Sequence, residues 1–137
     1  MALKSKLSSL VVNVQAEILS SLLDNGYLRL YGGDQPETGD TKSDGQEMLY
    51  ELRFGKSAFK PAVKGVITAH PISKDMMANV TGKATWYRCF SSDGVTGIMD
   101  GSVGIKDSGS NLELNSVDIQ AGAEVGIDFF QHRVPRG

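Results

Sequence analysis

The side chains best suited to nucleophilic catalysis or metal binding are few in this chain of 137 residues. Its only thiol is Cys89, and its only imidazoles are His70 and His132. Cys89 lies in a run of β-branched and aromatic residues, where a small buried thiol is the usual case. We expect His70 at a strand end and His132 in a terminal tail, both at the surface. No Cys/His spacing suits zinc, so these residues predict neither a nucleophilic pair nor a metal centre.

Acidic side chains gather in two polar stretches. Asp34, Asp40 and Asp44 belong to a long loop expected over residues 32–46, which is rich in Gly and Asp and contains one Pro. Residues 107–113 weakly resemble a calcium loop but lack its glycine and glutamate spacing. No two carboxylates are singled out for acid–base catalysis by a fixed spacing or an apolar pocket. We therefore expect solvated carboxylates, with no catalytic residue, no metal and no cofactor.

The sequence evidence for phosphate binding or nucleic-acid binding is equally weak. Gly55-Lys56-Ser57 looks like the end of a phosphate-binding loop, but position 50 is Tyr where that loop needs Gly. Fourteen basic and sixteen acidic side chains give a formal charge of −2, so no global field draws the protein to nucleic acid or to an anionic membrane. We expect neither partner.

The residue pattern near the N-terminus predicts an amphipathic helix over about residues 7–25, or a shorter one over about 14–24 if the β-branched residues 11–14 are extended. Apolar residues recur there at steps of three and four positions: Leu7, Leu10, Val11, Val14, Ile18, Leu22 and Leu23. Asp24-Asn25-Gly26 suits a helix end, because Asn and Gly tolerate the left-handed backbone. The apolar stripe must pack either on the protein's own sheet or on a neighbouring molecule.

The rest of the chain reads as short strands. The sequence has 16 Gly and 40% hydrophobic residues, which favours many turns around one core. Period-two alternation predicts strands near residues 27–31, 48–54, 63–69, 80–90, 95–105, 112–119 and 123–129. Asp93-Gly94 between two of them is a hairpin signal. We expect a single domain over residues 1–137, mainly β, with an antiparallel jelly-roll-like β-sandwich and one N-terminal helix.

Trp86-Tyr87 raises an alternative function. Aromatic rings can stack on sugars, as in a carbohydrate-binding β-sandwich module. Adjacent residues of a strand, however, point to opposite faces, so one ring is expected in the core. Silence on a glycan array, together with Trp fluorescence that sugars do not quench, would count against this alternative.

Four segments carry a resemblance to a known family. They are Leu28-Arg29-Leu30-Tyr31-Gly32-Gly33-Asp34-Gln35-Pro36, Leu49-Tyr50-Glu51-Leu52-Arg53-Phe54, Gly82-Lys83-Ala84-Thr85-Trp86-Tyr87-Arg88 and Met99-Asp100-Gly101-Ser102-Val103-Gly104. This layout resembles a family of small structural proteins encoded in tailed-phage virion modules. The resemblance implies a non-enzymatic β-sandwich protein of the virion, namely a head decoration or cement protein. A tail, neck or baseplate component is the alternative within the same class.

The resemblance also sets expectations for partners and place. It implies synthesis in the bacterial host cytoplasm, residence on the capsid surface, binding to the major capsid protein, and self-association, with a homotrimer as the expected form. The single cysteine agrees with a reducing compartment. The helix and the long loop are the candidate interface elements. Their candidate interface residues are Leu10, Val14, Ile18, Asp34, Asp40 and Asp44.

Overall fold

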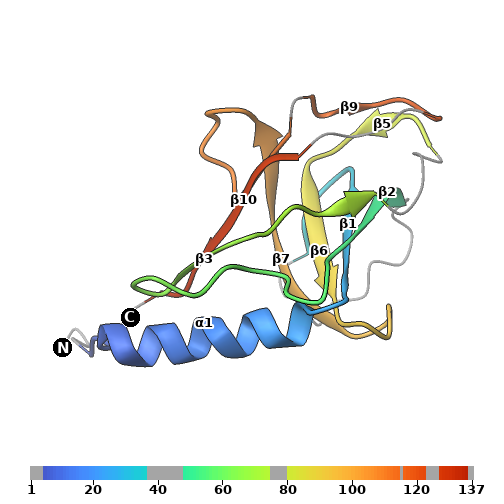
Figure 1. Cartoon of the computed structure of the whole chain (residues 1–137). Coiled ribbons are helices and arrows are strands. Elements are labelled where there is room, and N and C mark those ends of the chain that lie inside the picture. The colour runs from blue at the N-terminus through green and yellow to red at the C-terminus, as the bar shows by residue number, and fades with distance from the viewer. Residues whose placement is uncertain (1–4, 37–47, 75–79, 115, 123–126, 136–137) are drawn as a thin grey trace.

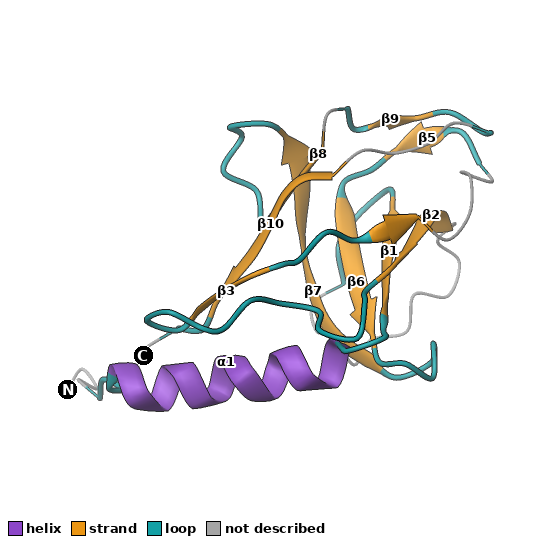
Figure 2. Ribbon diagram, in the orientation of Figure 1, coloured by secondary structure: helices purple, strands orange, loops and turns teal. Residues whose placement is uncertain are grey.

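A computed structural model describes residues 5–36, 48–74, 80–114, 116–122 and 127–135, which form one helix and ten strands. In chain order these are α1 (Ser9–Leu23), β1 (Tyr27–Tyr31), β2 (Met48–Arg53), β3 (Val66–Thr68), β4 (Ser73–Lys74), β5 (Gly82–Lys83), β6 (Trp86–Phe90), β7 (Gly97–Ile105), β8 (Leu112–Leu114), β9 (Asp118–Ile119) and β10 (Ile127–Arg133). The helix lies along one side of a β-rich body (Figure 2). The prediction of a mainly β protein with one N-terminal helix is confirmed.

Local side chains explain where α1 begins and ends. The Ser8 hydroxyl accepts a hydrogen bond from the Val11 amide at 3.3 Å, which caps the N-terminus. After Leu23 the chain turns through Asn25, whose φ is 58°. Gly26 follows because a Cβ there would lie 2.2 Å from the carbonyl oxygen of Phe90. The helix end expected from this Asn-Gly pair is confirmed.

Eight of the strands form one mixed sheet in the order β3-β10-β8-β7-β6-β1-β2-β4, and β5 pairs with β9 separately. The expected all-antiparallel arrangement is wrong at one place, because β7 and β8 run parallel, with Val103 beside Leu112. The connection between them doubles back through left-handed residues at Asp107 and Gly109. The chain thus reverses direction twice within a few residues and returns alongside β7 in the same sense.

The sheet is rolled. Its two edge strands, β3 and β4, are consecutive in the chain and separated only by residues 69–72. That connection can span at most about 18 Å, whereas eight flat strands would be about 34 Å across. The two edges are therefore drawn together, and Figure 1 shows the segment after β3 crossing toward β2 in front of β6 and β7.

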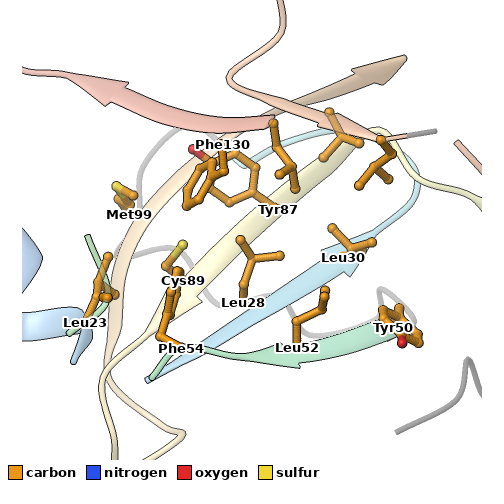
Figure 3. Packing of buried hydrophobic residues seen from close by; sticks show 14 of the residues in the cluster. Leu23, Leu28, Leu30, Tyr50, Leu52, Phe54, Tyr87, Cys89, Met99 and Phe130 are labelled. Atoms are coloured by element: carbon orange, nitrogen blue, oxygen red, sulfur yellow. The ribbon is translucent and has the colours of Figure 1, made fainter. Parts of the chain in front are cut away.

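The core fills the inside of this roll. Leu28 and Leu30 from β1 and Cys89 from β6 are fully buried there (Figure 3). Phe130 of β10 stands edge-on to Tyr87 of β6, with ring centroids 5.1 Å apart, so the two halves of the roll meet through aromatic contacts.

The other face of the central strands is polar and aromatic. Arg88 of β6 donates from Nε and Nη2 to the two carboxylate oxygens of Asp100 on β7, at 2.6 and 2.9 Å. Both side chains are buried. Tyr31 stacks on Trp86 with ring centroids 4.5 Å apart. This alternation of core side chains with ion pairs and rings keeps the strands in register.

The predicted hairpin at Asp93-Gly94 is confirmed by the antiparallel pairing of β6 with β7. The Asp93 carboxylate accepts hydrogen bonds from the Val95 and Thr96 amides, each at 2.8 Å, and from the Thr96 hydroxyl at 2.6 Å. These bonds, those from Thr96 above all, hold the pKa of Asp93 well below its usual range. Gly94 supplies the left-handed turn residue, with a φ of 71°.

Candidate docking surface

One face of α1 packs closely on the β body. Val12, Ala16 and Leu23 are fully buried on this inward face. The backbone beneath comes so near that a Cβ on Gly65 would lie 2.8 Å from a methyl carbon of Val12. Small residues at positions 16 and 20 permit the same close approach along the helix. The helix therefore rests directly on the irregular segment that leads into β3.

Side-chain hydrogen bonds fix the rotation of α1 about its axis. The Gly65 amide donates to Asn13 Oδ1 at 2.6 Å, and the Ala62 amide donates to Glu17 Oε1 at 2.8 Å. At the C-terminus of the helix, the Ala58 amide donates to Asp24 Oδ1, also at 2.8 Å. These amides belong to residues 58–65, where a regular strand partner is lacking, so the helix satisfies them. The side-chain oxygens of Asn13, Glu17 and Asp24 thus anchor the helix to the body.

The opposite, outward face of α1 is apolar and exposed. It consists of Leu7, just before the helix, and Leu10, Val11, Val14, Ile18 and Leu22 on the helix itself. Leu10 is 73% exposed, Val14 51% and Ile18 57%. In Figure 1 no other described element lies on this side of the helix. The predicted apolar stripe was expected to pack either on the protein's own sheet or on a neighbouring molecule. Of its residues only Leu23 is buried against the protein itself, and the others are exposed.

The size of this outward face sets it apart from ordinary surface leucines. Scattered exposed apolar residues are normal, but a contiguous patch of several hundred Å² is characteristic of an interaction site. The six side chains together expose the equivalent of about three whole apolar residues, worth roughly 5–9 kcal/mol gross if fully covered. Forming an association costs about 4–15 kcal/mol in lost freedom, so two such faces together approach what a complex needs.

The structure gathers only some of the predicted interface residues. Leu10, Val14 and Ile18 fall together on the outward face. Asp34 is exposed beyond the end of β1, at the opposite end of that strand from α1, so it is not part of this face. Asp40 and Asp44 lie outside the described residues. The structure therefore groups the apolar candidates and leaves the acidic ones apart.

Neither Trp86 nor Tyr87 exposes its ring for stacking on a sugar. Both side chains are fully buried. They point to opposite faces as expected, with Tyr87 against Phe130 in the core and Trp86 against Tyr31. The Trp86 indole N–H donates to the Gly32 carbonyl at 3.1 Å. This arrangement argues against a carbohydrate site built on these rings.

The residues suited to nucleophilic or metal chemistry are dispersed. Cys89 is fully buried, as predicted, and burial raises the pKa of its thiol well above the ordinary value. His132 is not in a surface tail as expected but half-buried in β10, beside Ile67 of β3, and burial lowers its pKa. The Glu113 carboxylate on β8 accepts hydrogen bonds from the Asp107 and Gly109 amides of the preceding loop. Within the described part of the chain, no three His, Cys, Asp or Glu side chains group to hold a metal.

Comparison of the chain with protein-family models, with curated proteins and with solved structures finds no match. No helix formed by the described residues is long and apolar enough to cross a membrane. The outward face of α1, which contains the predicted interface residues Leu10, Val14 and Ile18, is the candidate docking surface of the described residues.

Proposed function

We propose that this chain is a non-enzymatic structural protein of a tailed-phage virion, and that it decorates and stabilises the assembled head. The observation that carries the proposal is the outward face of α1, which offers protein contacts rather than a chemical site. An assembly component needs such a surface, whether to bind the capsid or to link one copy to the next. The major capsid protein is the proposed partner, and the capsid surface is the proposed location.

The arrangement of the resembling segments supports this assignment. They contribute β1, β2, β5 with β6, and β7, and four of these strands are adjacent in the sheet in the order β7-β6-β1-β2. Residues that are far apart in the sequence thus belong to one structural unit. We also propose that the roll is a variant of the jelly-roll-like sandwich, in which the ring of Phe54, the residue after β2, lies 6.2 Å from the ring of Phe130 on β10, centroid to centroid.

The mechanism follows from mass action. A protein that binds the assembled lattice and not its separated subunits stabilises the lattice by its binding free energy. Many equivalent sites on a shell add their contributions, and linking copies to one another raises the effective concentration of each for the next site. A modest contact per copy is then sufficient.

The test is the copy number of this protein in purified virions, measured by quantitative mass spectrometry against the major capsid protein. A count comparable to that of the capsid protein, kept in heads without tails, supports the proposal. A handful of copies, or loss together with the tail, assigns the protein to the neck, tail or baseplate instead. Absence from the particle overturns the virion role.

A further inference from the structure

We propose that the outward face of α1 is covered by α1 of a second copy of this chain, with the two helices antiparallel about a twofold axis near Val14 and Gln15. The inference deepens the proposed function, on which it rests, by naming the partner of the docking surface. The resulting pair is the unit that would attach to the capsid through its other surfaces.

The absence of charge on the outward face favours a copy of itself. The only charged residue between Ser9 and Leu23 is Glu17, and its carboxylate accepts from the Ala62 amide on the body side. The six side chains that form the outward face are therefore uncharged, and the one nearby charge, the exposed Glu17, has a carboxylate oxygen held by the body. In a twofold interface the same patch meets itself, which an uncharged apolar face can do without repulsion.

The charges at the ends of α1 favour the antiparallel direction. Lys6 precedes the helix N-terminus and Asp24 follows its C-terminus, the reverse of what the helix dipole favours, and neither terminal turn carries a compensating charge. An antiparallel second copy brings Lys6 of one chain beside Asp24 and the last carbonyls of the other. A parallel copy would bring like charges together at both ends.

The spacing and size of the face suit a helix pair. Leu7, Val11, Val14 and Ile18 follow one another at steps of four, three and four, the spacing of a helix–helix seam, and Leu10 and Leu22 flank it. Each copy offers on the order of 500 Å² of apolar surface, so a pair buries about 1,000 Å², the lower bound for a specific interface. The match is sufficient for a dimer of modest affinity.

The mass of the full chain in solution tests the pair, by sedimentation equilibrium over a wide range of protein concentration. Val14→Asp places two carboxylates face to face near the axis, and we expect it to weaken dimerisation at least about 100-fold. Val95→Asp is the matched control, because Val95 is 79% exposed in the β6–β7 turn. Circular dichroism must show that both variants keep the wild-type fold. A monomeric wild type, a trimer, or a Val14→Asp variant that still dimerises overturns the inference.

Disulfide trapping tests the direction of the helices. In the proposed pair Leu7 of one chain meets Leu22 of the other. A mixture of the Leu7→Cys and Leu22→Cys proteins, oxidised by copper–phenanthroline, is therefore expected to give a cross-linked heterodimer, while Leu7→Cys alone stays monomeric under denaturing conditions. The wild type is the control for the buried Cys89. Efficient cross-linking of Leu7→Cys to itself, without the heterodimer, contradicts the antiparallel arrangement.

These results separate the inference from the proposed function. Particles that carry the protein, with a wild type that is monomeric in solution, overturn the pair alone. A dimer lost in Val14→Asp, with no copies in purified virions, overturns the virion role and leaves the pair.

Discussion

Val12 and Val14 lie two residues apart on α1 and point in opposite directions. Val12 is fully buried against Gly65, whereas Val14 is 51% exposed on the outward face. The helix therefore has two apolar faces, and only one of them is used by the described part of the chain. The two valines form a matched pair for asking what each face contributes.

Truncating each valine should separate folding from docking. Val12→Ala leaves a cavity above Gly65 and is expected to lower the free energy of unfolding by about 1–3 kcal/mol. Val14→Ala should change it by less than about 0.5 kcal/mol at protein concentrations low enough to keep the chain monomeric. Urea unfolding followed by circular dichroism measures both. A dilute Val14→Ala protein as unstable as Val12→Ala would show that Val14 contributes to the core.

The rotation of α1 should depend on Asn13. Asn13→Ala leaves the Gly65 amide without its acceptor, at an expected cost of about 1–2 kcal/mol in the free energy of unfolding. Gln15→Ala, on the exposed side of the same helix, is the control and should be neutral at protein concentrations low enough to keep the chain monomeric, because Gln15 lies near the proposed twofold axis. Equal losses of unfolding free energy in the two variants would mean that the effect comes from helix propensity and not from the hydrogen bond.

The ion pair between Arg88 and Asp100 should be costly to break from one side. Asp100→Ala removes the carboxylate that both Nε and Nη2 of the buried Arg88 guanidinium contact, and it is expected to destabilise the protein by about 3–5 kcal/mol. Replacing both residues, Arg88→Met with Asp100→Leu, removes the buried charge and should cost markedly less. Thermal and urea unfolding of the single and double variants give the comparison. A double variant as unstable as the single one would assign the loss to packing.

His132 should make stability fall in mildly acidic solution. Burial lowers its pKa in the folded protein below the value of about 6.5 in the unfolded chain, so the folded state favours the neutral ring. The contribution of His132 is therefore fully present above about pH 6.5 and is lost as the pH falls toward the folded pKa. Urea midpoints at about pH 7.5 and 5.5 should differ less in His132→Asn than in the wild type. An equal difference between the two midpoints in the variant and the wild type would exclude His132 as a source of the pH dependence.

Much of the fold could be predicted because local chemistry decides it. Asn25 and Gly26 end α1 as predicted, and the alternation Tyr27–Tyr31 gives β1 with the expected bounds. The N-terminal cap at Ser8 was not predicted, and the helix begins at Ser9 rather than at about residue 14. The parallel pairing of β7 with β8 was not predictable, because it depends on how a short loop reverses twice at Asp107 and Gly109.

The residues of the candidate surface could be predicted from the sequence, but the residues by which α1 contacts the body could not. The apolar stripe contained Leu10, Val14 and Ile18, yet Val12 and Ala16, which make the contact with the body, were absent from it. Periodicity alone cannot say which of two adjacent apolar faces is covered. The covered face is fixed by hydrogen bonds, because amides within residues 58–65 donate to the side chains of Asn13, Glu17 and Asp24.

The retention of two variants in purified particles tests the central claim, that the outward face of α1 assembles this protein into a virion, most directly. Val14→Asp and Val95→Asp are expressed in place of the wild type, and their copies per particle are counted by mass spectrometry. Val95→Asp should be retained at the wild-type copy number, and Val14→Asp should be lost, because single copies lack the combined affinity of linked ones. Retention of Val14→Asp at the wild-type level would contradict the claim.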